Sequence, residues 1–167
     1  MAVRARLKQQ VSQLARALDL PPTWSVPDLA DRLSTLRGRP VHIDFLPRSQ
    51  PGEIPCGLWV STDTADYIYA RQGTSSLHHK HFVLHEVGHM ICGHQGLNVS
   101  LRLASMLPHL KPEVIRRALG RSTYSDPQEL EAEAFADLLY HYTRRNRSKQ
   151  ESDQLAQRAG LALGIRD

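Results

Sequence analysis

Cysteine is scarce in this chain of 167 residues, in which Cys56 and Cys92 are the only two. Two thiols far apart in sequence make a poor disulfide framework for a domain of this size, so we expect both to be small, reduced residues. Long apolar runs are also missing, which argues against a membrane span. Because no apolar segment follows the basic residues near Met1, the sequence predicts a cytoplasmic protein without a secretory signal.

An excess of charge of one sign is also largely missing, since the net charge is +4. That mild basic excess is too small to argue for nucleic acid or for an acidic partner. Basic residues concentrate from Arg144 to Lys149, without interleaved aromatic residues. Cations suit the C-terminus of a helix, so direct nucleic-acid binding is not expected there. A DNA contact that weakens steeply with salt stays open as an alternative.

The residue pattern predicts an α+β fold, mostly helical with a small three-stranded sheet. Helical spacing over residues 3–18 and 25–38 indicates an N-terminal helical hairpin at about 1–38. Alternation from Pro40, with Val41, Ile43 and Phe45 on one side, predicts a strand, and two more are expected at 57–61 and 65–69. Short helices are expected at 98–109 and 112–119. We expect one domain over 1–145 and a basic tail over 146–167, forming a short helix or disordered.

A helix from Ser75 or Ser76 to Gly93 is expected to carry His85-Glu86-Val87-Gly88-His89. Two imidazoles four residues apart lie one above the other on a helix and could hold one metal ion. The projection places the imidazoles on one face and apolar residues on the other. The remaining histidines of this region are interpreted as bystanders: His78, His79, His81 and His94.

A later helix is expected from Asp126 to about Arg145, because Asp126-Pro127-Gln128-Glu129 has the form of a capping box. That box gives Glu129 a structural role. The projection puts Glu131 in the middle of an apolar face, and Glu133 on the opposite side. The apolar residues of that face are Leu130, Ala134, Phe135, Leu138, Leu139 and Tyr142. A carboxylate among apolar neighbours needs a partner or a metal.

Glu131 needs a partner, and the helix with two histidines needs a third ligand. Together these predict that His85, His89 and Glu131 hold one zinc ion (Zn2+) per chain, with a fourth position for water. Glu86 is then the catalytic general base for hydrolysis. The alternative is that the histidines are ordinary residues of a half-buried helix and that Glu131 pairs with an arginine. Tyr124 and His109 are candidate stabilisers of the transition state. Asp137 could orient a ligand from behind, although its projection leaves this open.

Two segments together resemble the ImmA/IrrE family of metallopeptidases. They are Leu84-His85-Glu86-Val87-Gly88-His89, followed by Gly93-His94, and Glu129-Leu130-Glu131-Ala132-Glu133-Ala134-Phe135-Ala136. The resemblance covers roughly residues 25 to 142, and the family's ligand glutamate falls on Glu131. It implies a zincin-like fold with the sheet packed on the metal-binding helix. The chain departs from the family in having Glu133 where Asn or Asp is common, and in lacking the Met-Pro that often follows the last helix.

The resemblance also implies a cytoplasmic zinc endopeptidase that cuts a regulatory protein. The expected partner and substrate is a helix-turn-helix transcriptional repressor, in transcription regulation or stress response. An alternative is a zincin-fold binding module, for a regulator or a toxin/antitoxin-type partner, with little or no turnover. Loss of cleavage with retained partner binding in Glu86→Gln would favour the enzyme.

Overall fold

The computed structural model describes residues 2–21, 23–46, 57–71, 75–94 and 124–162. Its elements are α1 (Ala2–Leu18), α2 (Val26–Arg37), β1 (Val41–Leu46), β2 (Gly57–Ser61), β3 (Asp66–Arg71), α3 (Ser76–Cys92) and α6 (Asp126–Ala162). The predicted α+β class, mostly helical with three strands, is confirmed. The helices expected at 98–109 and 112–119, with His109 and Cys56, lie outside the described residues. Among the described helices, none combines the length and hydropathy needed to cross a membrane.

The sheet has β3 in its centre, with the strand order β1-β3-β2. Strand β1 pairs with β3 in parallel, and β2 pairs with β3 in antiparallel. Ile68, Tyr69 and Ala70 are fully buried in succession, so side chains on both faces of β3 are covered. The alternation predicted for β1 fails at its end, where Leu46 is buried and Phe45 is 37% exposed.

Buried Asp66 joins the sheet to the end of α2. Its carboxylate accepts hydrogen bonds from Arg37 Nε at 2.6 Å and from Arg39 Nη2 at 2.5 Å. The Nε of Arg39 donates another at 2.8 Å, and the indole Nε1 of Trp59 donates at 3.1 Å. A fully buried carboxylate is tolerated only with such partners, so these contacts fix β3 beside β2 and α2.

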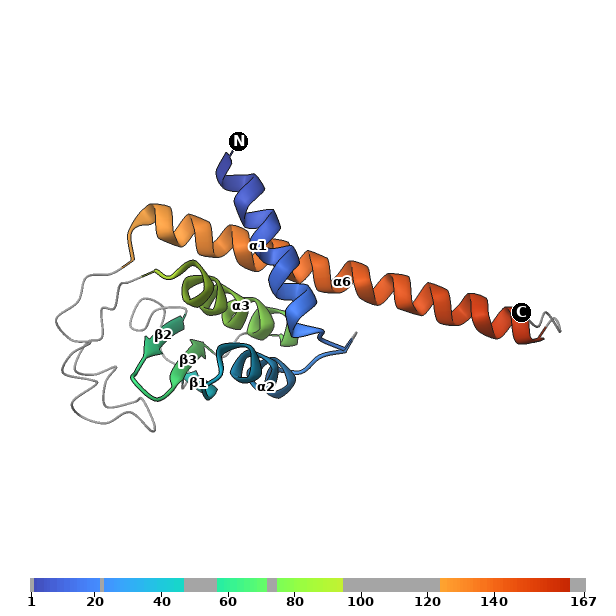
Figure 1. The fold of residues 1–167 in the computed structure, drawn as a ribbon, viewed down its shortest axis with the longest axis horizontal. Helices are drawn as coiled ribbons and strands as arrows, with labels where there is room; N and C mark the ends of the chain where they lie inside the picture. The colour runs from blue at the N-terminus through green and yellow to red at the C-terminus, as the bar shows by residue number, and fades with distance from the viewer. Residues whose placement is uncertain (1, 22, 47–56, 72–74, 95–123, 163–167) are drawn as a thin grey trace.

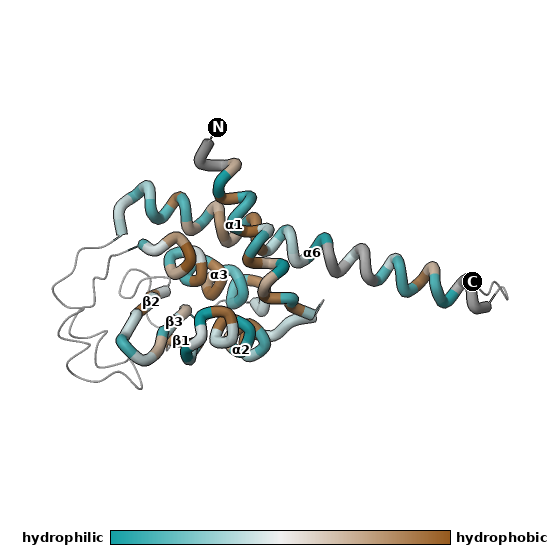
Figure 2. Tube along the Cα trace, viewed as in Figure 1, coloured by the Kyte–Doolittle hydropathy of each residue, from teal (hydrophilic) through white to brown (hydrophobic). Residues whose placement is uncertain are grey.

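Helix α3 lies between α6 and the sheet, and α1 packs across α6 (Figure 1). The core joins apolar residues of α1, α2, β1, β3, α3 and α6, and Figure 2 shows them gathered in the body of the molecule. Helix α3 is therefore covered on both sides, which explains why the core includes Val83 and Val87 while His89 is also fully buried. The arrangement brings the imidazole face of α3 against another helix.

Helix ends follow the predicted chemistry in α2 and α3. Ser25 and Asp28 form a capping box at the start of α2, and Gly38 ends the helix with φ 64°. The Ser75 side chain caps α3 by accepting from the His78 N–H. Gly93, with φ 70°, ends it in the left-handed conformation. The predicted limits of both helices are confirmed.

Helix α6 does not end near Arg145 as predicted, but continues to Ala162. The segment after Arg145 contains no proline, and its first glycine is Gly160, so nothing in the chain breaks the helix earlier. The prediction of a short helix or disorder from residue 146 is therefore wrong for residues 146–162. Residues 151–158 are all exposed, and this half of α6 extends away from the body (Figure 1). The basic segment Arg144 to Lys149 lies inside the helix, so the helix-end explanation for its charge no longer applies.

Candidate metal centre

Helix α3 brings the rings of His85 and His89 together, as the four-residue spacing predicts. Their Nε2 atoms are 3.0 Å apart, and the rings meet edge to face with centroids at 4.8 Å. His89 is fully buried, whereas the His85 side chain is 16% exposed. Burial, followed by the charges of His85 and His94, lowers the pKa of His89 to about 3. A neutral imidazole is the form that binds a metal ion.

The carboxylate that meets these two nitrogens belongs to Glu129. Its Oε2 lies 3.1 Å from His85 Nε2 and 3.6 Å from His89 Nε2. Tetrahedral zinc with bonds of about 2.0 to 2.2 Å places its ligand atoms about 3.3 to 3.6 Å from each other. Two of the observed separations, 3.0 and 3.1 Å, are about 0.2 to 0.3 Å shorter than that range, and the third, 3.6 Å, lies at its upper limit. The three donor atoms, including Glu129 Oε2, are therefore close enough together to share one metal ion.

Glu131, predicted as the third ligand, lies elsewhere. Its Oε2 is 3.1 Å from His94 Nε2, and its Oε1 accepts from Arg6 Nη2 at 2.5 Å. Desolvation raises the pKa of Glu131, but the hydrogen bonds from His94 and Arg6 hold this pKa below its ordinary value. The prediction that Glu131 contacts His85 and His89 does not match this geometry. The alternative, in which Glu131 pairs with an arginine, describes the contact that forms.

The error comes from the start of α6. Ser125 precedes the helix, and the Gln128 side chain accepts from its backbone N–H at 2.9 Å and from its hydroxyl at 3.1 Å. The helix start is thus held at Ser125, one residue earlier than the predicted cap, and Glu129 is free to face α3. The projected face was also rotated, because Leu130 is 72% exposed. The buried face keeps Phe135 and Leu139 of the projected face and adds Ala132 and Ala136, and Glu129 lies one turn before Ala132 on it.

Both His85 and His89 have a partner for the ring nitrogen that faces away from the three donor atoms. His85 Nδ1 lies 3.1 Å from Glu133 Oε2, and the other oxygen of Glu133 lies 3.1 Å from His81 Nε2. His89 Nδ1 lies 2.9 Å from His94 Nδ1. Such contacts fix ring orientation and tautomer in metal sites. His81 and His94, interpreted as bystanders, therefore contact the site from behind, and so does Glu133.

Glu86 is 2% exposed and lies against the backbone of β2. It accepts a hydrogen bond from the Trp59 backbone, and a Cβ on Gly57 would overlap its carboxylate. Burial and then the charge of Glu129 raise the pKa of Glu86 well above its ordinary value, against that hydrogen bond. Its Oε2 has no hydrogen-bond partner in the described part of the chain. A Glu86 oxygen also lies within 4.8 Å of His85 and His89 ligand nitrogens, which is within reach of a shared water.

Tyr124, one of the two predicted stabilisers, stacks on the His89 ring. The ring centroids are 3.6 Å apart, with 11° between the planes. Burial raises the pKa of Tyr124 above its ordinary value, and the charges of Glu86 and Glu129 add to this. Its hydroxyl therefore keeps its proton, and that hydroxyl is buried without a partner among the described residues. His109, the other candidate, lies outside the described residues.

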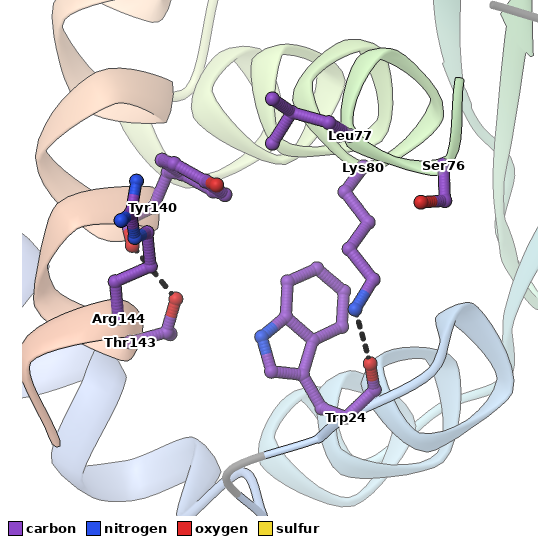
Figure 3. Close-up of a pocket in the computed structure, with 7 residues that line it drawn as sticks. All are labelled: Trp24, Ser76, Leu77, Lys80, Tyr140, Thr143 and Arg144. Atoms are coloured by element: carbon purple, nitrogen blue, oxygen red, sulfur yellow. Dashed lines mark hydrogen bonds between the residues drawn. The ribbon is translucent and has the colours of Figure 1, made fainter. Parts of the chain in front are cut away.

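A pocket of about 320 Å³ lies away from these histidines, between the start of α3 and the middle of α6. Figure 3 shows Lys80 reaching across it to Trp24, where it donates to the backbone carbonyl at 2.5 Å and lies over the indole. On the α6 side, Arg144 lies over the Tyr140 ring. The cations of this pocket thus contact the protein's own aromatic rings, and the pocket contains none of the predicted site residues.

Comparison of the sequence with protein-family models and with curated proteins, and of the structure with solved structures, finds no match. The assignment of a function therefore depends on the geometry of the centre itself.

Proposed function

We propose that this chain is a zinc-dependent endopeptidase of the zincin type, in which His85, His89 and Glu129 hold one zinc ion. The observation that carries the proposal is the convergence of three donor atoms, from two helices, to within about 0.3 Å of the spacing of tetrahedral zinc ligands. Each donor comes from a residue type that zinc favours. Two buried polar atoms without partners among the described residues, Glu86 Oε2 and the Tyr124 hydroxyl, adjoin the same centre. Buried polar atoms are normally satisfied, so these two indicate a place for bound water and substrate.

Two histidines and one glutamate leave a fourth position for water, which is the pattern of catalytic rather than structural zinc sites. Bound zinc supplies Lewis acidity and lowers the pKa of water. Glu86 accepts a proton from the attacking water as the carbon–oxygen bond forms at the peptide carbonyl. It then passes that proton to the amine nitrogen as the carbon–nitrogen bond breaks. The raised pKa of Glu86 suits both steps, because the group must take up a proton and release it.

Tyr124 is placed to act on the other side of the reaction. Its ring is stacked on that of His89, one of the three proposed ligands. Because the Tyr124 hydroxyl stays protonated, it donates a hydrogen bond to the carbonyl oxygen as negative charge develops there.

The substrate class follows from the resemblance to ImmA/IrrE metallopeptidases, with the ligand glutamate moved from Glu131 to Glu129. It belongs to the proposal, together with a cytoplasmic location: a regulatory protein, in the first instance a helix-turn-helix repressor encoded beside this chain. The binding module without turnover is the competing outcome of the same assay.

Zinc binding tests the ligand set. The affinity is measured by competition with a chromophoric chelator in wild type, Glu129→Ala and Glu131→Ala. Structural zinc sites release about 10 to 16 kcal/mol over four ligands, so one ligand contributes roughly 3 kcal/mol, or about two orders of magnitude in affinity. We expect that loss for Glu129→Ala, and at most about a tenfold loss for Glu131→Ala. The reverse order would restore the original assignment of Glu131, and absence of zinc from the wild type would refute the site.

Turnover tests the reaction. The wild type is incubated with the helix-turn-helix protein of the neighbouring reading frame, and cleavage is followed by mass spectrometry. We expect Glu86→Gln to bind zinc as tightly as the wild type and to leave that protein intact. Binding of the same protein by a wild type that does not cut it would favour the binding module.

A further inference from the structure

A continuous series of contacts leads from the back of His89 to the surface of α1. His89 Nδ1 meets His94 Nδ1 at 2.9 Å, and His94 Nε2 meets Glu131 Oε2 at 3.1 Å. The Arg6 Nη2 then donates to Glu131 Oε1 at 2.5 Å. Three helices are linked in this way, because His89 lies on α3, Glu131 on α6 and Arg6 on α1. We call these four residues the His89 relay.

The proton positions along the relay have one consistent arrangement. The Nε2 of His89 is one of the three proposed donor atoms, so in the metal-binding tautomer the His89 proton is on Nδ1. That N–H donates to His94 Nδ1, which must accept and therefore leaves the His94 proton on Nε2. The Nε2–H of His94 donates to one oxygen of Glu131, and the guanidinium of Arg6 donates to the other oxygen of the same carboxylate. Each group thus selects the tautomer of the next, and the series ends on a fixed positive charge.

Burial makes His94 the indispensable member. His89 is fully buried and His94 is 5% exposed, so water does not readily replace the His94 ring. The Arg6 side chain, by contrast, is 61% exposed, and the Glu131 side chain is 18% exposed. Removing His94 leaves the Nδ1–H of His89 without a partner in a buried position, which is costly and lets the ring rotate.

We propose that His94 is a positioning residue for the zinc site, held in turn by Glu131 and Arg6. The proposal depends on the proposed function, because it assigns His94 to the ligand His89. His85 has a direct carboxylate partner in Glu133, whereas His89 reaches its carboxylate through a second imidazole. The N-terminal helix α1 therefore contributes to the metal centre without touching it.

A second metal site is the competing interpretation of the same residues. Ligand atoms of Cys92, His94 and Glu131 lie within 4.8 Å of one another. Two observations favour the relay. Arg6 already places a positive charge on Glu131, which opposes a cation there. Burial, with the charge of Glu131, also raises the pKa of the Cys92 thiol to about 11, so the thiol stays protonated.

Zinc affinity of the full chain is the test, measured by competition with a chromophoric chelator. Contacts behind a ligand typically contribute 10- to 100-fold in metal affinity, and we expect a loss of that size for His94→Ala. His94→Asn keeps an acceptor near the position of Nδ1 and should recover part of the loss. Glu131→Ala should cost about threefold to tenfold. Arg16→Ala, on the exposed side of α1, is the matched control for Arg6→Ala, where the expected loss is at most about threefold.

Two further measurements separate positioning from folding. Cobalt-substituted protein should show altered visible absorption bands in His94→Ala and unaltered bands in Arg16→Ala, because only the first changes the geometry of His89. Urea unfolding of the metal-free variants gives the loss of stability that a merely structural role would produce. Should His94→Ala fail to fold, His94→Asn and Glu131→Ala provide the same comparison.

The outcomes are distinct. Unchanged zinc affinity and cobalt spectra in folded His94→Ala, with one zinc bound per wild-type chain, would overturn the relay and leave the proposed function intact. A wild type that binds no zinc would overturn both. Two metal ions per chain, with the second lost in Cys92→Ser, would replace the relay by a second metal site.

Discussion

Gly88 sets how closely α3 and α6 approach each other, and replacing it with alanine should weaken zinc binding. A Cβ at Gly88 would lie 3.0 Å from the Ala132 carbonyl oxygen and 3.1 Å from its Cα. Both contacts are to backbone, so no side-chain rotation can relieve them. Helix α6 must instead move away from α3.

The size of that movement follows from the contact. Ordinary van der Waals contact begins at about 3.4 Å, so the carbonyl at 3.0 Å must retreat by about 0.4 Å. Glu129 lies one turn before Ala132 on the same face and moves with it. Metal–ligand distances tolerate about 0.2 Å, so we expect roughly a tenfold loss of zinc affinity.

Stability should change less than affinity. Overpacking lowers the free energy of unfolding by about 1 to 3 kcal/mol, and the higher helix propensity of alanine than of glycine raises it by about 1 kcal/mol. The metal-free variant should therefore lose about 0 to 2 kcal/mol, measured by urea unfolding.

Gly38→Ala is the control, because Gly38 has φ 64° and its Cβ would meet nothing within 4 Å. Backbone strain there should lower stability by about 1 kcal/mol and leave zinc affinity unaltered. Unaltered zinc affinity in Gly88→Ala, measured by chelator competition, would refute the view that this helix contact positions Glu129.

Three other substitutions separate the parts of the molecule. Gly57→Ala should displace the Glu86 carboxylate and lower turnover about 100-fold, while zinc affinity stays within about threefold of the wild type. Equal losses of turnover and of zinc affinity would contradict the assignment of Glu86 as the general base. Tyr124→Phe keeps the ring stacked on His89 and removes the hydroxyl, so turnover should fall about tenfold or more with zinc retained; full activity would exclude Tyr124 as a donor. Asp66→Asn should cost roughly 3 kcal/mol in urea unfolding at pH 7. Desolvation raises the pKa of Asp66, but its hydrogen bonds from the arginines and the indole hold that pKa below 3.8. The wild type should therefore exceed Asp66→Asn in free energy of unfolding by the full amount above pH 3.8, and this difference should disappear as the pH falls through the lower pKa of the folded state. A difference that does not change with pH would contradict this.

The sequence predicts the α3 side of the centre well, for local reasons. A serine cap at Ser75 and a left-handed glycine at Gly93 are encoded within a few residues of the helix ends. The four-residue spacing then determines that His85 and His89 share a face. Tertiary contacts are not needed for any of these inferences.

The α6 side was mispredicted because a helix projection depends on where the helix starts and on what covers it. Both Ser125 and Asp126 can cap a helix, and the choice of Asp126 assigned Glu129 to the cap. Glu131 lies two residues away, or about 200° around the helix, so the two carboxylates face different neighbours. The contact of Glu131 with Arg6 depends on α1 packing across α6, which no local pattern encodes.

The position of His94 beside His89 has a signal in the sequence. Gly93 turns the chain back in the left-handed conformation, and the His94 N–H donates to the His89 carbonyl at 3.0 Å. This closure is the usual consequence of a glycine after a helix, and it returns the following residue to the last turn. A histidine directly after such a glycine is therefore expected near the final residues of the helix.

The donor atoms of the centre come from two helices, and His85 and Glu129 are 44 residues apart in the chain. Under the proposed function, one ion acts as a removable cross-link between these distant segments. Free zinc at about 1,000 times its dissociation constant would add about 4.1 kcal/mol to the free energy of unfolding. The half-life of the protein in a cell would then follow the supply of zinc, so a shortage of the ion would reduce the amount of enzyme as well as its activity.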